Sequence, residues 1–233
     1  MLSAAYGQAS GIATVEGESK WSAERRDALA ANLRLARKLD AHNRWLVGQN
    51  RKRLDGESLR DALLAVSGEF VGERGGPGVR PPLPRELVST LLKGQWEVSP
   101  RTADHRRASV YLFVRRNLPH PWLAAFDRGD ATASCPMRVR TTTAPQALAL
   151  WNSEFTWTCS DSLAGRLLGE VPGNDERLQT LARRCLSRRF TEGELAELRG
   201  WLEEERRQSA DERLAWSNLV RTVVCLHEFL YLD

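Results

Sequence analysis

Three charged residues at helical spacing provide the first candidate chemistry in this chain. Glu57 is followed by Arg60 and Asp61, and residues three or four positions apart lie on one face of a helix. Two carboxylates held side by side can act as a general acid and a general base. The same spacing is also typical of an ion-pair network with only a structural role, so both interpretations stay open.

Two arginines ahead of a predicted helix start form a second candidate. Arg138 and Arg140 precede Thr143, where a threonine followed three positions later by glutamine predicts a capping box. Because a helix start carries unpaired N–H donors, two guanidinium groups beside it would favour an anion such as a carboxylate or sulfate. Salt bridges to Asp127 or Asp130 are the structural alternative.

Asn152 provides an amide at the far end of the same predicted helix. It lies four residues after Leu148 and three before Phe155, so a continuous helix would hold it half-buried beside the apolar face. A half-buried amide needs a hydrogen-bond partner, which is either a loop of the protein or a ligand. The candidate ligand-binding residues are therefore Arg138, Arg140 and Asn152, and the candidate catalytic residues are Asp127 and Glu57.

No residue spacing in the sequence is typical of a metal or haem site. The histidines are His42, His105, His120 and His227, and the cysteines are Cys135, Cys159, Cys185 and Cys225. No two cysteines have the two-residue spacing of a zinc site, and the Cys-x-x-Cys-His motif of covalent haem is absent. We therefore predict no metal and no cofactor in this chain. Three of the cysteines (Cys159, Cys185 and Cys225) lie in apolar helical patterns, where a free cysteine packs as a small core residue.

Charge and hydropathy argue against two classes of partner. The chain has 34 basic and 30 acidic residues, a formal net charge of +4, and its basic pairs are scattered. This distribution does not predict a nucleic-acid surface. No apolar run reaches the roughly 18 residues of a membrane span, and the segment after Met1 does not resemble a signal peptide.

The pattern of apolar residues predicts a mainly α-helical protein. Helices are expected over 22–39 and 57–66, with Gly68 as the C-terminal stop of the second. Residues 109–115 are β-branched and aromatic and predict one strand, with 96–98 as a short partner.

From Thr143 onward the sequence predicts a helical bundle. Further helices should begin at Asn174, at Thr191 with Glu194 as a second capping box, and at about Asp211. The last helix should turn Leu219, Val223, Leu226 and Leu230 towards a core. The predicted fold is thus mainly α: an irregular N-terminal helical region with a small β element, then an antiparallel C-terminal bundle. We treat 1–233 as one domain with subregions 1–142 and 143–233.

A series of sequence landmarks carries a family resemblance through nearly the whole chain. They are SAAYGQAS (3–10), DAHNRWL (40–46), RLDGESLRDALLAVSG (53–68), GGPGV (75–79), VYLFVRRNLPHPWLAAFD (110–127), CPMRVRTTTAPQALALWN (135–152), LSRRFTEGEL (186–195) and HEFLYLD (227–233). In this order they resemble the C-terminal domain of unknown function in large planctomycete surface proteins. The segment between 10 and 40 is longer than is usual in that family, which suggests a local insertion.

The resemblance implies a setting but no reaction. Such proteins carry a planctomycete-type cytochrome c module and a second uncharacterised domain upstream, so haem and partner domains would lie outside this chain. They are exported, which implies the periplasm or the cell surface. Since the chain starts inside the family's pattern, we expect it to be truncated at its N-terminus relative to the family.

Three hypotheses for function follow. The first is an accessory or binding module of such an exported protein, since no complete catalytic motif is present. The second is an extracellular hydrolase of polysaccharide, with Asp127, Glu57 and Arg138 converging in one cleft. The third is a gene fragment without a function of its own.

Overall fold

The structure is a computed structural model that describes residues 22–45, 50–92, 94–129, 131, 134–209 and 211–232. It divides into two compact units, Met1–Arg53 with Tyr231–Asp233, and Leu54–Leu230. Each unit is described by itself. The landmark at 3–10, the expected insertion up to residue 21 and Asp130 lie outside the described residues.

The first unit contains one helix and one short strand pair. Helix α2, Ala23–Leu39, begins at Ser22, whose side chain accepts a hydrogen bond from the Arg25 backbone N–H. This confirms the helix predicted over 22–39. Strand β1, Lys52–Arg53, pairs antiparallel with β2, Tyr231–Leu232. Arg51 lies over the Tyr231 ring at 4.9 Å, a cation–π contact that supports this pairing.

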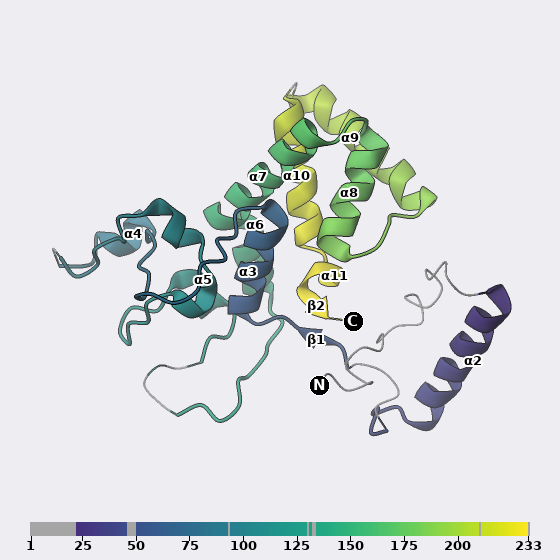
Figure 1. The fold of residues 1–233 in the computed structure, drawn as a ribbon, viewed down its shortest axis with the longest axis horizontal. Helices are drawn as coiled ribbons and strands as arrows, with labels where there is room; N and C mark the ends of the chain where they lie inside the picture. The colour runs from purple at the N-terminus through teal and green to yellow at the C-terminus, as the bar shows by residue number, and fades with distance from the viewer. Residues whose placement is uncertain are drawn as a thin grey trace. The chain divides into compact units, whose positions relative to one another are not determined.

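The second unit is mainly helical, as Figure 1 shows. Its α-helices are α3 (Gly56–Ser67), α4 (Arg85–Val88), α5 (Pro121–Ala125), α6 (Ala144–Asn152), α7 (Glu154–Glu170), α8 (Asn174–Leu186), α9 (Glu192–Ser209), α10 (Glu212–Val224) and α11 (His227–Leu230). Two 3₁₀ turns, η1 (Thr102–Arg106) and η2 (Ser109–Tyr111), lie between α4 and α5. The predicted mainly α fold class is confirmed.

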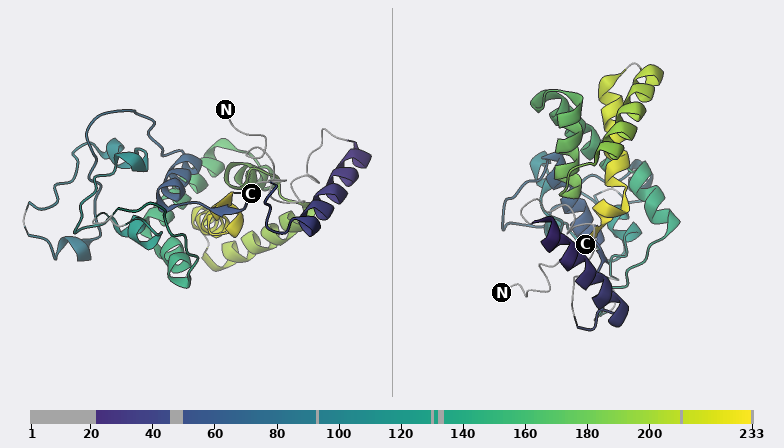
Figure 2. Two further views of the ribbon diagram at one scale, coloured as in Figure 1. Left: turned by 90° about the horizontal axis from the view of Figure 1, so that it is seen from below. Right: turned by 90° about the vertical axis from the view of Figure 1, so that its right-hand side faces the viewer.

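Much of the core of this unit lies in the C-terminal bundle. Helix α10 packs along α7, and the helices α8 and α9 lie beside this pair (Figures 1 and 2). Its fully buried side chains come from all four helices: Leu163, Leu167, Leu178, Leu181, Leu202, Trp216, Leu219 and Val220. Burying an aliphatic side chain of this size contributes about 1.5–3 kcal/mol each. The same core cluster continues into α3 and α5 through Leu59, Leu63 and Trp122.

Local signals predicted the starts of these helices. The Thr143–Gln146 capping box is present at α6, where the Gln146 side chain accepts from the Thr143 backbone N–H at 3.2 Å. The second box is present at α9, where Glu194 accepts from the Thr191 N–H at 2.7 Å. At the other end of the bundle, α10 stops at Val224, so the predicted core position of Leu226 is wrong: its side chain is 41% exposed.

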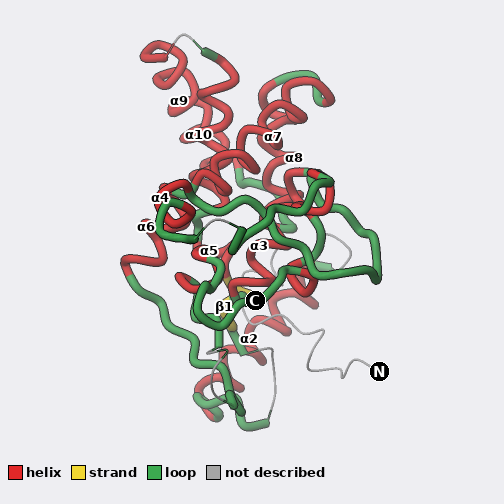
Figure 3. Tube along the Cα trace, turned by 90° about the vertical axis from the view of Figure 1, so that its left-hand side faces the viewer, coloured by secondary structure: helices red, strands yellow, loops and turns green. Residues whose placement is uncertain are grey.

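The predicted strand at 109–115 is wrong. The segment begins as η2 and continues as extended loop, with isolated bridges from Val79 to Leu112 and from Arg115 to Leu118. Residues 96–98 are loop and do not pair with it. The β-branched and aromatic composition was misleading. Two backbone hydrogen bonds join the segment to Val79, but they form an isolated bridge and not a strand, and Arg60 and Asp61 of α3 bind the start of the segment. Figure 3 shows how much of the chain between α3 and α6 is loop.

Helix α3 connects this irregular region to the bundle, since it packs against α5, α7 and η2. Its close approach to α5 depends on Gly56. A Cβ atom at Gly56 would lie 2.9 Å from the Cβ of Phe126, and the Gly56 carbonyl accepts a hydrogen bond from Trp122 Nε1 at 3.3 Å. The absence of a side chain at this position therefore sets the spacing between α3 and α5.

Replacing Gly56 with alanine should destabilise the protein by about 1–3 kcal/mol, because the added methyl group overpacks this contact. Gly200→Ala is the matched control: it lies inside α9, where an added Cβ meets nothing within 4 Å, and should stabilise by about 1 kcal/mol. Urea unfolding followed by circular dichroism measures both. Equal effects at the two glycines would contradict the packing argument.

Candidate functional site

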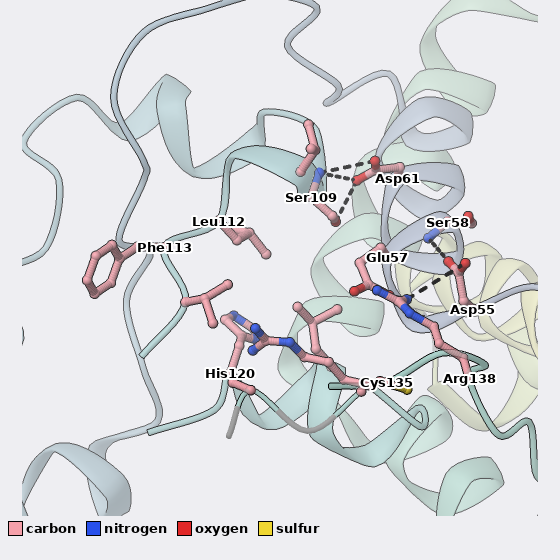
Figure 4. A pocket seen from close by; sticks show the side chains of 16 residues that line it. Asp55, Glu57, Ser58, Asp61, Ser109, Leu112, Phe113, His120, Cys135 and Arg138 are labelled. Carbon is pink, nitrogen blue, oxygen red and sulfur yellow. Dashed lines mark hydrogen bonds and ion pairs between the residues drawn. The ribbon is translucent and has the colours of Figure 1, made fainter. Parts of the chain in front are cut away.

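A pocket of about 840 Å³ opens between the start of α3 and the segments 109–114 and 120–138. Asp55, Glu57 and Asp61 line its acidic wall, and Val110, Leu112, Phe113 and Val114 line its apolar wall. The remaining side contains His120, Arg128, Cys135 and Arg138. Figure 4 shows the acidic wall and Arg138 on one side and Phe113 on the opposite side.

Asp55 is the N-cap of α3. Its carboxylate accepts a hydrogen bond from the Ser58 N–H at 2.8 Å. Desolvation by burial opposes ionisation, but the bonds from Ser58 and the charges of Arg138 and Arg140 outweigh it and hold the pKa of Asp55 below its usual value. Asp55 therefore stays ionised and serves the helix start.

Arg60 and Asp61 hold the irregular segment 105–109 against α3. The Arg60 guanidinium, 4% exposed, donates to the carbonyl oxygens of His105 at 2.6 Å and Arg107 at 2.9 Å. Asp61 accepts from the Ser109 backbone N–H at 2.8 Å and from its hydroxyl at 2.7 Å. Arg60 and Asp61 also contact one another at 3.4 Å. We call this set the Arg60–Asp61 clamp.

Arg138 pairs with Glu57, its guanidinium lying 2.8 Å from the Glu57 carboxylate and 4.0 Å from that of Asp55 (Figure 4). The hydrogen bond to Glu57, together with its charge, raises the pKa of Arg138. The expected salt bridge to Asp127 is wrong, because Asp127 accepts from the Thr141 N–H and hydroxyl, both at 2.7 Å. The other expected partner, Asp130, lies outside the described residues.

Only part of the expected catalytic set is brought together. Glu57 and Arg138 line the pocket side by side, whereas Asp127 is not among its lining residues. Asp127 has a left-handed backbone, φ 59°, just after α5. Its carboxylate ties that turn to the segment leading into α6 through Thr141, which in turn accepts from the Gln146 side chain at 3.0 Å.

Of the other two expected ligand residues, neither lines the pocket. Arg140 is exposed, and its charge acts on Asp55. Asn152 is also exposed, so the predicted half-burial is wrong. The physical reason is a helix break: α6 ends at Asn152, and the extended backbone of Ser153 separates it from α7. The periodicity that related Asn152 to Phe155 therefore does not apply.

Two pocket residues, His120 and Arg128, were not singled out from the sequence. Burial, together with the charges of Arg60 and Arg128, lowers the pKa of His120 to about 4, and its Nδ1 is buried without a partner among the described residues. The only sequence signal was the position of His120 between two prolines, just before the short helix α5. Nothing in the sequence pattern marked Arg128.

Cys135 is the exposed thiol of the pocket, and it donates to the Met137 carbonyl at 3.4 Å. The other cysteines behave as core residues. Burial raises the pKa of Cys159 and of Cys225 to about 11 and that of Cys185 to about 12. These three thiols stay protonated at neutral pH, and a protonated thiol is a poor nucleophile.

The described residues contain neither a metal-binding group nor a membrane-spanning helix. No group of histidine, cysteine, aspartate and glutamate in that part of the chain is arranged to hold a metal ion. None of the helices found there has the length and apolar character needed to cross a membrane.

The fold and pocket define a mainly helical module in which a bundle supports an irregular, arginine-rich pocket region. A family model described as "PSD1: Protein of unknown function (DUF1553)" matches residues 1–202. The chain therefore belongs to this family. No match was found among curated proteins or solved structures.

Replacing Arg60 with methionine should cost about 3–5 kcal/mol of unfolding free energy, because it leaves two carbonyl oxygens and the Asp61 carboxylate without their buried partner. Arg189→Met is the control, since Arg189 is exposed and its side chain makes no interaction with the described residues. Urea unfolding gives the stabilities. Limited proteolysis should show faster cleavage within 101–116 in the Arg60 variant, and a loss below 1 kcal/mol would contradict the clamp.

The lowered pKa of His120 predicts a pH-dependent stability. Between pH 6.5 and 4 the unfolded state binds a proton at His120 that the folded state does not, so stability falls as pH falls through this window. From pH 7 to pH 5 the loss should be about 2 kcal/mol. His120→Gln should remove that part of the slope in urea unfolding at the two pH values. Parallel slopes in the variant and the natural protein would contradict burial of a neutral imidazole.

Proposed function

We propose that this chain is an accessory binding module of an exported multidomain protein that carries a cytochrome c module. Membership of the PSD1 family over residues 1–202 supports the description as a module. The resemblance of its landmarks to the C-terminal domain of planctomycete surface proteins supports the cytochrome c setting. From that setting we infer that the module lies in the periplasm or at the cell surface.

The non-catalytic part of the proposal rests on one observation: among the described residues that line the pocket, each carboxylate already has a structural partner. Asp55 caps α3, Glu57 is paired with Arg138, and Asp61 holds Ser109. A hydrolase needs one carboxyl group that protonates the leaving group and a second that acts as base or nucleophile. Carboxylates already committed to caps and clamps would have to break structural bonds to serve in that way.

Isolation of the native protein from its source organism tests whether this chain is part of an exported protein with a cytochrome c module. An antibody against residues 54–230 should detect, in the envelope fraction, a band well above 26.2 kDa that also stains for covalent haem. The haem stain should survive denaturation, because thioether-linked haem stays with its polypeptide. A band at 26.2 kDa in the cytoplasmic fraction, without haem, would contradict the proposal.

The same proposal predicts that purified residues 1–233 unfold cooperatively on heating and release no reducing ends from polysaccharides. Absence of a cooperative transition would favour a gene fragment instead. Sugar release that disappears in Glu57→Gln, with unfolding unchanged, would favour the hydrolase hypothesis.

A further inference from the structure

Helix α6 is apolar on the side that faces away from the core as well as on the side that faces it. Leu150 is 1% exposed, whereas Leu148 is 60% exposed and Trp151 38%. The nine residues of this helix include no charged side chain. A surface helix normally presents polar or charged side chains to water, and a helix that is apolar all round is a buried one. The outward face of α6 therefore has the composition of a buried surface.

This outward face is formed by four exposed side chains, which we call the α6 stripe: Ala144, Ala147, Leu148 and Trp151. Residues at positions i, i+3, i+4 and i+7 lie on one side of a helix. The two small side chains occupy the first half of the stripe and the two large ones the second half. The Trp151 ring is held in place by Arg221 of α10, whose guanidinium lies 4.5 Å from the ring centroid. The shape of the stripe is therefore set before any partner binds.

We propose that the α6 stripe binds the same stripe of a second copy of this chain, with the two α6 helices antiparallel about a two-fold axis. An axis that passes between Ala147 and Leu148 places Leu148 of each copy against Ala147 of the other. The same axis places Trp151 against Ala144 of the partner subunit. Each large side chain then meets a small one, which lets the two helices approach closely and fill the space between them. Such a contact is self-complementary, as a two-fold interface requires.

The charges at the two ends of the stripe suit the same arrangement. Glu154, the first residue of α7, lies just beyond Trp151, and Arg140 precedes α6 at the opposite end. Both side chains are exposed, and within the described part of the chain neither makes a hydrogen bond or an ion pair. In the antiparallel pair, each Glu154 approaches Arg140 of the partner subunit. A parallel pair would instead bring like charges together at both ends, so the charges favour the antiparallel one.

Sedimentation equilibrium of purified residues 1–233 tests the pairing. The average mass should rise with concentration from 26.2 kDa towards twice that value. The Kd should lie in the micromolar range, because two short helices bury a small interface. Leu148→Glu should weaken the dimer by about 100-fold or more, since it places two carboxylates beside the two-fold axis. Leu35→Glu is the matched control: Leu35 is 56% exposed on α2, and its replacement should leave the average mass unchanged.

Charge reversal tests the orientation of the two helices. Glu154→Arg should weaken the dimer by about 3–30-fold, because an attraction becomes a repulsion at both ends of the pair. Adding Arg140→Glu to that variant should restore the affinity, and thermal unfolding followed by circular dichroism checks that each variant stays folded.

A monomer at every concentration up to about 200 μM would mean that something other than a second copy covers α6, and would overturn the proposal. A dimer that Leu148→Glu leaves intact would also overturn it. A double variant that binds no better than Glu154→Arg alone would contradict the antiparallel pairing. None of these results bears on the cytochrome c setting, because the antibody experiment tests that separately.

Discussion

The Arg60–Asp61 clamp is the interaction on which the rest of the irregular region depends. Residues between α3 and α5 have few ladder hydrogen bonds of their own, so buried carbonyl groups there need donors from elsewhere. Arg60 supplies them to His105 and Arg107, and Asp61 receives the Ser109 N–H. Arg60 and Asp61, adjacent on α3, thus supply hydrogen bonds that the predicted strand would have received from a sheet. The apolar wall of the pocket follows directly after this anchored segment.

The electrostatic character of the pocket follows from the same helix. The start of α3 places the carboxylates of Asp55 and Glu57 at the cavity. Arg138, far along the chain, forms a salt bridge with Glu57. Burying such pairs is costly unless the remaining donors and acceptors are also satisfied. Most of these pairs are therefore partly exposed and individually weak. Arg60 is the buried exception: desolvation lowers its pKa despite the opposing charge of Asp61, and two carbonyl oxygens accept hydrogen bonds from its guanidinium.

Local patterns predicted much of the fold and little of the site. Both capping boxes, the start of α8 and the Gly68 stop are determined by neighbouring residues, so the sequence shows them directly. The strand at 109–115 and the burial of Asn152 failed because tertiary contacts and a helix break override composition and periodicity. Arg128 could not be found from spacing, since its position in the pocket depends on segments that lie far apart in the sequence.

Ser153 joins α6, which leads from the irregular region, to α7 of the bundle. Its extended backbone ends α6, and its side chain caps α7 by accepting from the Thr156 N–H at 3.0 Å. One residue thus sets the rotation of α6 about its own axis relative to the bundle. Each residue of an α-helix turns by about 100°. A single-residue insertion there would turn Gln146 away from Thr141 and break the contact that links α6 to the turn at Asp127.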